Sequence, residues 1–238
     1  MKKKALLIAI EGSDGAGKAT QTNLLYNYFK KQIFQGKNLK VARVSFPRYN
    51  QTLGGTLLYE VLKSERADSY GFSKIDPRVA SKLYAMDREE SLPYLESLIA
   101  RNDIVIFDRY VESNLLHQGG KFSTNKDRLE FAEWLFRFEY GNIGLPQPDT
   151  IMYLALPFSI SLRRAELRAQ ATSSTLDAVE KDKKYVRQGH NAGIFYARHF
   201  GWNVVNGVSR GKELTEIEVH NIILETLRPW NQKKLFEG

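Results

Sequence analysis

The sequence predicts an α/β protein in which helices cover both faces of a parallel sheet of about five strands. Five short apolar runs, rich in β-branched residues and bounded by turn residues, are typical of buried strands. Long stretches with the helical period of 3.6 residues separate these runs. Because such alternation forms βαβ units, we expect the strands to be parallel and the helices to lie on both faces.

The elements follow one another in a simple order. The predicted strands are "ALLIAI" (5–10), "LKVARVSF" (39–46), "DIVIFD" (103–108), "TIMYLAL" (150–156) and "WNVVN" (202–206). The predicted helices occupy about 17–36, 76–101, 124–141, 157–169, 177–200 and 213–228. A length of 238 residues suits one large α/β domain better than two, so we expect residues 1–238 to form a single domain.

Composition excludes several classes of protein. No run reaches the roughly 18 apolar residues that a membrane-spanning helix needs. The basic, then apolar start "MKKKALLIAI" has the look of a signal peptide, but it continues directly into charged "EGSDG", which favours a first buried strand. The chain has no cysteine, so disulfides and Cys-ligated zinc are excluded, and we expect a cytoplasmic protein.

The net charge of +8 allows two interpretations, a solvated basic surface or a nucleic-acid-binding protein. The arginines stand singly beside aromatic and acidic residues, in "FPRY", "MDREE" and "FDRY". Dispersed arginines suit a small polyphosphate ligand better than a long nucleic-acid backbone. We therefore expect no nucleic-acid partner.

The segment after the first strand fits the phosphate-loop pattern G-x-x-x-x-G-K and opens a helix. Glycines let the backbone approach a ligand closely, and the successive N–H groups converge on phosphate oxygens at the positive end of the helix. This context predicts the three-layer αβα sandwich of the P-loop NTPases and an ATP site. The ATP-binding residues predicted here are Gly12, Ser13, Asp14, Gly15, Ala16, Gly17, Lys18, Ala19 and Thr20.

Ala19 stands where such loops normally carry a serine or threonine that binds Mg²⁺. Thr20 does not simply substitute, because one helical step turns its direction by about 100°. Magnesium keeps several waters and needs only one or two protein carboxylates besides phosphate oxygens. We expect weaker or more water-mediated Mg²⁺ binding, with Asp14 and Asp108 as candidate ligands; a degenerate, inactive loop is the alternative.

The tripeptide Asp108-Arg109-Tyr110 follows the third predicted strand, at the sheet edge where ligands bind in doubly wound folds. Asp108 is placed to hold hydrated Mg²⁺, and Arg109 to bind an acceptor phosphate through two hydrogen bonds. A helix cap and a surface arginine are the structural alternative.

Six segments in order resemble the thymidylate kinase (dTMP kinase) family over nearly the whole chain. They are "IEGSDGAGKATQ" (10–21), "FPRY" (46–49), "LYAMDR" (83–88), "DRYVESNLLHQG" (108–119), "GLPQPD" (144–149) and "LDAVEKD" (176–182). The turn "GLPQPD" is quite specific, and the ordered set of six is stronger than any one segment. The resemblance implies ATP as phosphoryl donor, dTMP as acceptor, Mg²⁺ as cofactor, and a homodimer.

The resemblance also implies an acceptor site. Arg48 and Arg109 correspond to arginines that contact the acceptor phosphate, Tyr84 to an aromatic residue that stacks on thymine, and Arg88 to an arginine that reaches a base carbonyl. The acceptor-binding set implied is Asp14, Phe46, Arg48, Tyr84, Arg88, Arg109, Asn114 and Gln118. Asp14 matches a loop acid near the acceptor's sugar and phosphate, and its role there or at the metal is open. His117 stands where relatives often have a tyrosine near the sugar.

The catalytic arginine is expected in a lid of about 164–177. Some family members carry this arginine in the loop directly after the acid, where this chain has Gly15. Arg164 and Arg168, four residues apart on one helical face, match the R-x-x-x-R before the family's lid, and Arg163 lies beside them. We therefore expect Lys18, Arg164, Arg168 and Asp108 to be catalytic. Glu180 matches an acidic position after the lid that supports the metal or a hinge.

The function predicted is ATP-dependent phosphorylation of dTMP to dTDP. A kinase for another nucleotide or a deoxynucleoside, a nucleotide-binding module without turnover, and a nucleic-acid-binding protein are the alternatives. Phe131, Trp134 and Phe138 belong either to the dimer face or to the core; the pattern does not distinguish the two.

Overall fold

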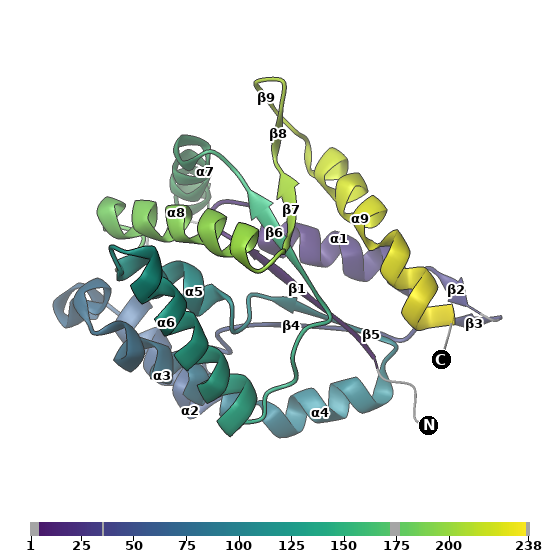
Figure 1. Ribbon diagram of the computed structural model, residues 1–238, viewed down its shortest axis with the longest axis horizontal. Helices are drawn as coiled ribbons and strands as arrows, with labels where there is room; N and C mark the ends of the chain where they lie inside the picture. The colour runs from purple at the N-terminus through teal and green to yellow at the C-terminus, as the bar shows by residue number, and fades with distance from the viewer. Residues whose placement is uncertain (1–4, 35, 172–176, 237–238) are drawn as a thin grey trace.

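The computed structural model describes residues 5–34, 36–171 and 177–236, and a five-stranded parallel sheet forms its centre (Figure 1). The strands lie in the order β4-β5-β1-β6-β7, and every neighbouring pair is parallel. Their bounds are β1 Leu6–Gly12, β4 Val41–Ser45, β5 Ile104–Asp108, β6 Thr150–Ala155 and β7 Asn203–Asn206. All five coincide with the predicted runs, so the predicted fold class is confirmed.

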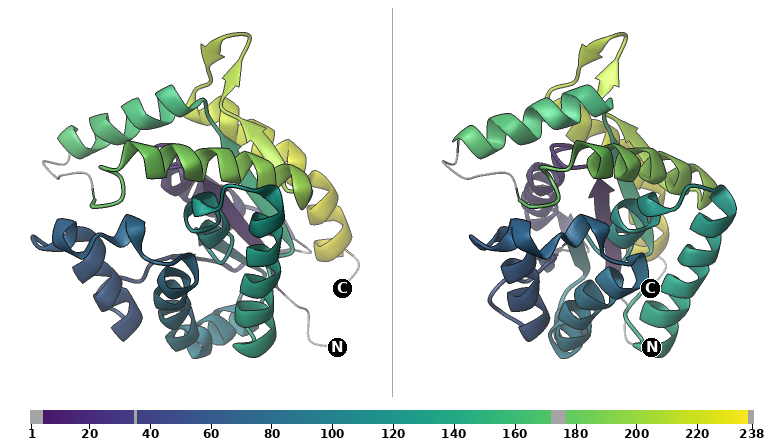
Figure 2. Two further views of the ribbon diagram at one scale, coloured as in Figure 1. Left: turned by 60° about the vertical axis from the view of Figure 1, so that its left-hand side comes forward. Right: turned by 90° about the vertical axis from the view of Figure 1, so that its left-hand side faces the viewer.

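β1 is the central strand, and all seven of its residues are buried. Its side chains alternate between the two faces of the sheet. Leu7 and Ala9 join a core that includes residues of α5, α6 and α8, whereas Ile8 and Ile10 join a second core that includes residues of α1 and α9. Figures 1 and 2 show α1 and α9 together on one side of the sheet and α5, α6 and α8 on the other. A strand buried on both faces explains why "LLIAI" is apolar without interruption.

Most helices lie where the periodicity predicted them. They are α1 Lys18–Lys30, α3 Pro77–Glu90, α4 Leu92–Arg101, α6 Asn125–Phe136, α7 Phe158–Ala171, α8 Lys183–His199 and α9 Glu216–Phe236.

Several helix boundaries differ from the prediction. α6 ends at Phe136 rather than near 141, and α9 continues to Phe236 rather than ending near 228. Three further differences each have a local reason. The stretch 76–101 forms two helices, because Pro93 in the first turn of α4 has no N–H to continue the helical ladder. The helix predicted over 17–36 ends at Lys30, and the chain then forms the hairpin of β2 (Ile33–Phe34) and β3 (Lys37–Asn38). α8 begins at Lys183 because the Asp182 carboxylate accepts the N–H of Tyr185 at 3.1 Å as an N-cap.

Several short elements were not predicted. They are α2 Leu53–Lys63, α5 Ser113–His117, the 3₁₀ turns η1 Ala67–Tyr70, η2 Phe72–Lys74 and η3 Gly119–Lys121, the π turn η4 Arg137–Asn142, and the hairpin of β8 Val208–Ser209 and β9 Lys212–Glu213. α2 was not predicted because Gly54 and Gly55 in its first turn lower the helix propensity of the segment. In the structure Thr52 caps it by accepting the N–H of Gly55 at 2.8 Å.

Two further findings concern the periphery of the fold. Within the described ranges, every helix is too short or too polar to cross a membrane. The β8–β9 hairpin projects beyond the end of β7, near α7 (Figures 1 and 2).

The close crossing of α2 and α3 depends on Gly54. A Cβ there would lie 2.3 Å from the backbone nitrogen of Asp87. We expect Gly54→Ala to force the two helices apart and to lower the free energy of unfolding by about 1–3 kcal/mol, measured by urea denaturation. Gly141→Ala is the matched control, because the nearest atom to its Cβ would be 4.0 Å away; equal stability of the two variants would contradict this account.

Candidate active site

The phosphate loop connects β1 to α1, as predicted. Gly15 and Gly17 adopt positive φ angles of 78° and 90°, which favour glycine. A Cβ on Gly15 would lie 2.2 Å from the carbonyl oxygen of Ser161 in α7. The position that carries an arginine in some relatives therefore has room only for glycine in this chain.

Lys18 is buried inside the loop. Its ammonium donates to the carbonyl oxygens of Gly12 and Ser13, both at 2.8 Å, and lies 3.8 Å from the Asp14 carboxylate. Burial, with the nearby positive charge of Arg109, lowers the pKa of Lys18 to about 8. The loop thus holds its cation at the point where its backbone turns.

α7 is attached to the same loop. The Ser161 hydroxyl donates to the Asp14 carbonyl oxygen at 2.7 Å and lies 2.7 Å from the Ser13 hydroxyl. Because α7 also carries the arginines assigned to the lid, the loop and the start of the lid are mechanically connected.

An ion pair joins the phosphate loop to the end of β5. The Arg109 guanidinium binds the Asp14 carboxylate and lies 3.3 Å from Nε2 of His117. Burial alone would raise the pKa of Asp14, but Arg109 and Lys18 outweigh it and hold that pKa well below its ordinary value. Burial lowers the pKa of His117 to about 4, so its imidazole is neutral at pH 7.

Glu11, which the sequence analysis did not single out, holds the turn after β5 in place. Its fully buried carboxylate accepts the N–H of Tyr110 at 2.7 Å and the hydroxyl of Ser113 at 2.6 Å. Directly before these anchors, Arg109 adopts a left-handed conformation with φ of 64°. This backbone turn directs Arg109 toward the loop.

A cavity of about 580 Å³ opens beside this ion pair, within the size range of nucleotide sites. Its lining includes five cationic residues, Lys63, Arg88, Arg109, Arg168 and Lys181, and three acidic ones, Asp14, Asp177 and Glu180. Burial, together with the charge of Glu180, raises the pKa of Asp177 to about 7. Because the cationic residues outnumber the acidic ones, and Asp177 is only partly ionised near pH 7, the cavity favours an anionic ligand.

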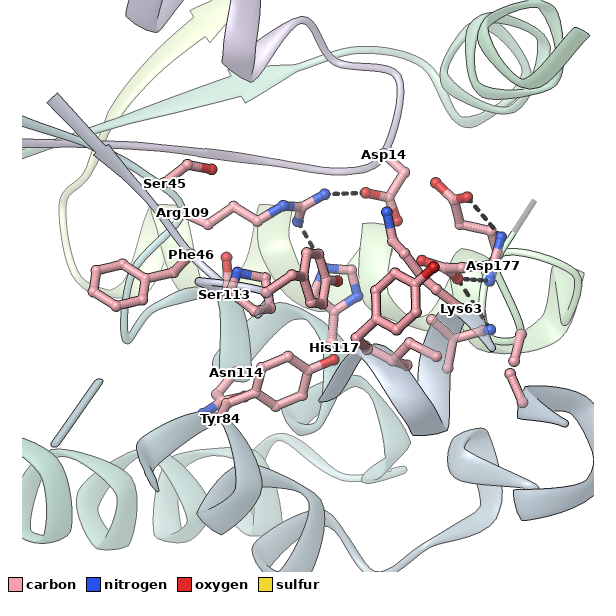
Figure 3. A pocket seen from close by; sticks show the side chains of 18 of the residues that line it. Asp14, Ser45, Phe46, Lys63, Tyr84, Arg109, Ser113, Asn114, His117 and Asp177 are labelled. Carbon is pink, nitrogen blue, oxygen red and sulfur yellow. Dashed lines mark hydrogen bonds and ion pairs between the residues drawn. The ribbon is translucent and has the colours of Figure 1, made fainter. Parts of the chain in front are cut away.

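The far end of the cavity is aromatic and polar. Tyr84 and Asn114 lie across the cavity from Asp14 (Figure 3). Arg88, also in the lining, donates from Nε and Nη2 to the buried Glu139 carboxylate at 2.5 and 2.7 Å. Asn114 donates to the same carboxylate at 3.1 Å. A flat ring with polar edges fits this end, while an anionic group fits the end near Arg109.

The structure brings most of the implied acceptor residues together, with two exceptions. Asp14, Phe46, Tyr84, Arg88, Arg109 and Asn114 all line the cavity, and so does His117.

Arg48 lies outside this lining, because its guanidinium donates to Ser91 and Gln51, both at 3.0 Å, and stacks on Tyr94. The next residue, Tyr49, faces the cavity instead. Gln118 is fully buried behind the wall, where it donates to the hydroxyl of Tyr185 at 3.1 Å.

The two lid arginines occupy different places. Arg168 lines the cavity and pairs with Glu180 at 2.5 Å. Arg164 lies outside the lining and pairs with Glu213 of the β8–β9 hairpin at 2.9 Å. Of the lid predicted over 164–177, residues 164–171 belong to α7, and residues 172–176 lie outside the described residues.

The residues near the loop fit a magnesium ion held largely by phosphate and water. In the described part of the chain, no cluster of three His, Asp, Glu or Cys side chains has the arrangement of a metal site. Asp108 ends β5 with its carboxylate 3.4 Å from the Ser45 hydroxyl, whereas Asp14 already contacts two cations. Ala19 is exposed and Thr20 half-buried at the start of α1. Asp108 is thus the better of the two candidate ligands.

Four residues important to the cavity were missed by sequence reasoning: Glu11, Tyr49, Glu139 and Asp177. Glu11 and Glu139 were visible only as single acids within apolar or aromatic runs, "LLIAIEG" and "WLFRFEYG". Tyr49 is adjacent to Arg48, and the sequence analysis assigned Arg48 rather than Tyr49 to the acceptor site. The hydrogen bonds of Glu11 and Glu139 join residues 25 or more positions apart in sequence, so local patterns did not reveal them.

Comparison with known proteins identifies the family. The thymidylate kinase family model matches residues 10–196. The thymidylate kinase of Mycobacterium tuberculosis (strain H37Rv) is 33% identical over 165 residues, covering 69% of this chain and 72% of that protein. A probable thymidylate kinase of Pyrococcus abyssi is 31% identical over 193 residues, covering 79% of this chain and 82% of that protein.

A solved structure shares the fold. The thymidylate kinase of Candida albicans superimposes with a TM-score of 0.71 at 20% sequence identity, over 98% of this chain and 94% of that chain.

Glu112 provides a test of the buried charges beneath the site. Its carboxylate accepts from the Tyr140 hydroxyl at 2.5 Å, and burial, with the charge of Glu11, raises its pKa to about 8. An unfolded chain releases this proton near pH 4.5, whereas the folded protein keeps it until about pH 8, so this group lowers stability as pH rises through that window.

We expect Glu112→Gln to remove this dependence. Its free energy of unfolding, relative to the unsubstituted protein, should increase by about 2–4 kcal/mol between pH 5 and pH 8. Urea denaturation at both pH values measures the difference. A constant difference between the two proteins at both pH values would show that Glu112 is ionised in the folded state throughout.

Proposed function

This chain belongs to the thymidylate kinase family, and from that premise we propose that it transfers the γ-phosphoryl group of ATP to dTMP, giving dTDP and ADP. The observation that carries the proposal is the position of Asp14 and Arg109. They lie at the junction between a phosphate loop and a cavity of nucleotide size. A donor bound on the loop and an acceptor in the cavity meet at this junction.

The loop binds the donor. Backbone N–H groups of residues 12–18 and the positive end of α1 hold the phosphates. Lys18 exchanges its contacts with the two loop carbonyls for phosphate oxygens. Such an exchange requires no large movement, because the ammonium already lies inside the loop.

The cavity binds the acceptor. Arg109 holds its phosphate, while Tyr84 stacks on the base and Arg88 and Asn114 contact the base edge. Phe46 and Tyr49 complete the wall. His117 adjoins Arg109, and its neutral imidazole adds no positive charge beside the acceptor phosphate. In this arrangement the Arg48 guanidinium does not contact the acceptor phosphate, because it donates to Ser91 and Gln51.

Phosphoryl transfer leaves the protein to position the reactants and to stabilise charge. An acceptor phosphate oxygen attacks the γ-phosphorus while the bond to the β-phosphate oxygen breaks, and no covalent enzyme intermediate forms. Mg²⁺ neutralises charge on the donor oxygens when bound, and Asp108 is the side chain that would hold it. Arg168 reaches the cavity from α7 and stabilises the transferred group, and closure of the lid excludes water.

Arg168 and Arg164 contribute unequally in this proposal. Arg164 first has to leave Glu213 to approach the site.

We also propose a homodimer in the cytoplasm. Phe131 belongs to the core, whereas Trp134 and Phe138 are half-buried and stack on each other with ring centroids 5.5 Å apart, which leaves part of both rings for a partner subunit.

A substrate panel tests the proposal. ADP formation from ATP and Mg²⁺ is measured with dTMP, dUMP, dCMP, dGMP, dAMP and thymidine as acceptors. We expect the highest kcat/KM with dTMP. Preference for another acceptor would identify a kinase of different specificity, and ATP binding without turnover on any acceptor would indicate a nucleotide-binding module.

Arg168 offers a test of catalysis. Since an arginine at the transferred group contributes about 10³–10⁵ in rate, Arg168→Ala should lower kcat at least about 100-fold, with the KM for dTMP changing less than about fivefold. Arg163→Ala is the matched control on the same helix, because Arg163 is exposed and pairs with Glu213. Equal losses in the two variants would contradict a catalytic role for Arg168.

Ala19 offers a test of metal binding. We expect Ala19→Ser to restore a hydroxyl ligand and to lower the Mg²⁺ concentration for half-maximal activity by about three- to tenfold, equivalent to about 1 kcal/mol of binding. Titration of activity with Mg²⁺ measures the shift, and EDTA should abolish turnover in both proteins. An unchanged Mg²⁺ requirement would mean that position 19 does not face the metal.

A further inference from the structure

We propose that Glu139 is a positioning residue that fixes the hydrogen-bonding polarity of the base end of the cavity. Through Arg88 and Asn114 it selects a pyrimidine with an imide edge, that is, a carbonyl beside a ring N–H. It thereby rejects a pyrimidine whose carbonyl is replaced by an amino group. This inference rests on the proposed function, because it concerns how the same cavity recognises its acceptor.

An irregularity in the backbone determines the direction of the Glu139 side chain. α6 ends at Phe136, and the chain continues as the π turn η4 over residues 137–142. The wider turn places Glu139 inward with no exposed surface, while Phe138 and Tyr140 on either side stay half-buried. Such π turns often occur at functional sites, because they redirect a side chain that a regular helix would aim elsewhere.

Arg88 presents a donor to the cavity because of this contact. Glu139 accepts from Nε at 2.5 Å and from Nη2 at 2.7 Å, which fixes the plane of the guanidinium. Nη1 remains on the other edge, 3.4 Å from the carbonyl oxygen of Tyr110. Since a guanidinium has no acceptor, Arg88 offers only N–H groups to a ligand.

Asn114 presents the opposite polarity for the same reason. A carboxylate only accepts hydrogen bonds, so the amide nitrogen of Asn114 has to face Glu139, at 3.1 Å. The amide oxygen is then the pole that a ligand meets. Burial raises the pKa of Glu139, and the charge of Arg88 with the hydrogen bonds from both residues opposes that rise.

The resulting pair, a donor from Arg88 and an acceptor from Asn114, complements an imide edge. The ring carbonyl of thymine accepts from Arg88, and the adjacent ring N–H donates to Asn114. A 4-aminopyrimidine inverts both groups, so donor meets donor and acceptor meets acceptor. Each buried polar group left unpaired costs about 1–3 kcal/mol, and sites built around such groups discriminate strongly.

The first experiment uses the unsubstituted protein with two acceptors, dTMP and 5-methyl-dCMP. The second differs from dTMP only at the proposed edge and keeps the methyl group. We expect kcat/KM to be at least about 100-fold higher for dTMP, as two mismatched hydrogen bonds imply. A ratio below about threefold would overturn the proposal, whatever any variant does.

The second experiment assigns the selectivity to Glu139. Glu139→Gln keeps the size of the side chain but supplies both a donor and an acceptor, so the Asn114 amide is no longer held in one orientation. We expect the ratio of kcat/KM for dTMP over 5-methyl-dCMP to fall at least about tenfold, with the KM for ATP unchanged.

Glu112→Gln is the matched control, because Glu112 is also a buried glutamate but accepts from Tyr140 and not from the base-end pair. It should leave the ratio unchanged. A merely structural role of Glu139 would lower kcat/KM for both acceptors equally, and that outcome would overturn the proposal.

Failure of this inference and of the proposed function are distinguishable. Turnover of dTMP without discrimination against 5-methyl-dCMP contradicts only the role of Glu139. Absence of dTMP turnover contradicts the proposed function, and calorimetric titration of the two acceptors then decides the base-end polarity. Equal affinity for both acceptors, or affinity for neither, would overturn it.

Discussion

The ion pair between Asp14 and Arg109 is the constraint on which the rest of the site depends. It connects the phosphate loop after β1 with the turn after β5, two segments 95 residues apart in sequence. The parallel register that pairs Ile10 with Asp108 brings the ends of these strands together. Because both partners are largely buried, removing either one would leave a buried charge with less compensation. The phosphate loop and the cavity are therefore fixed relative to each other.

Buried glutamates hold the residues around this ion pair and at the other end of the cavity in place. Glu11 holds the backbone around Arg109, and Glu139 holds Arg88 and Asn114 at the opposite end of the cavity. Both are fully buried, and both are held by hydrogen bonds from groups that line or adjoin the site. Rigid support of this kind favours catalysis by positioning, since a misplaced side chain would forfeit much of the advantage of bringing two substrates together.

The α7 side of the cavity is arranged differently from the side that contains Arg88 and Asn114. Ser161 joins α7 to the loop, but the arginines of α7 lie in ion pairs that are partly exposed, Arg164 with Glu213 and Arg168 with Glu180. Partly exposed pairs contribute little stability and exchange partners readily. A rigid cavity and exchangeable contacts of α7 suit an enzyme that has to close over two substrates and then release two products.

The sequence by itself determined the positions of the five strands along the chain, the phosphate loop, the residue that follows β5 and the family. These features are local: a buried parallel strand is apolar without interruption, and a phosphate loop needs its glycines and lysine at fixed spacing. Only the tertiary structure decided that Tyr49 rather than Arg48 faces the cavity, that Gln118 lies behind its wall, and that Arg164 and Arg168 have different partners. It also revealed Glu11 and Glu139. Direction of a side chain and pairing of buried charges depend on contacts between segments distant in sequence, and no local pattern records those contacts.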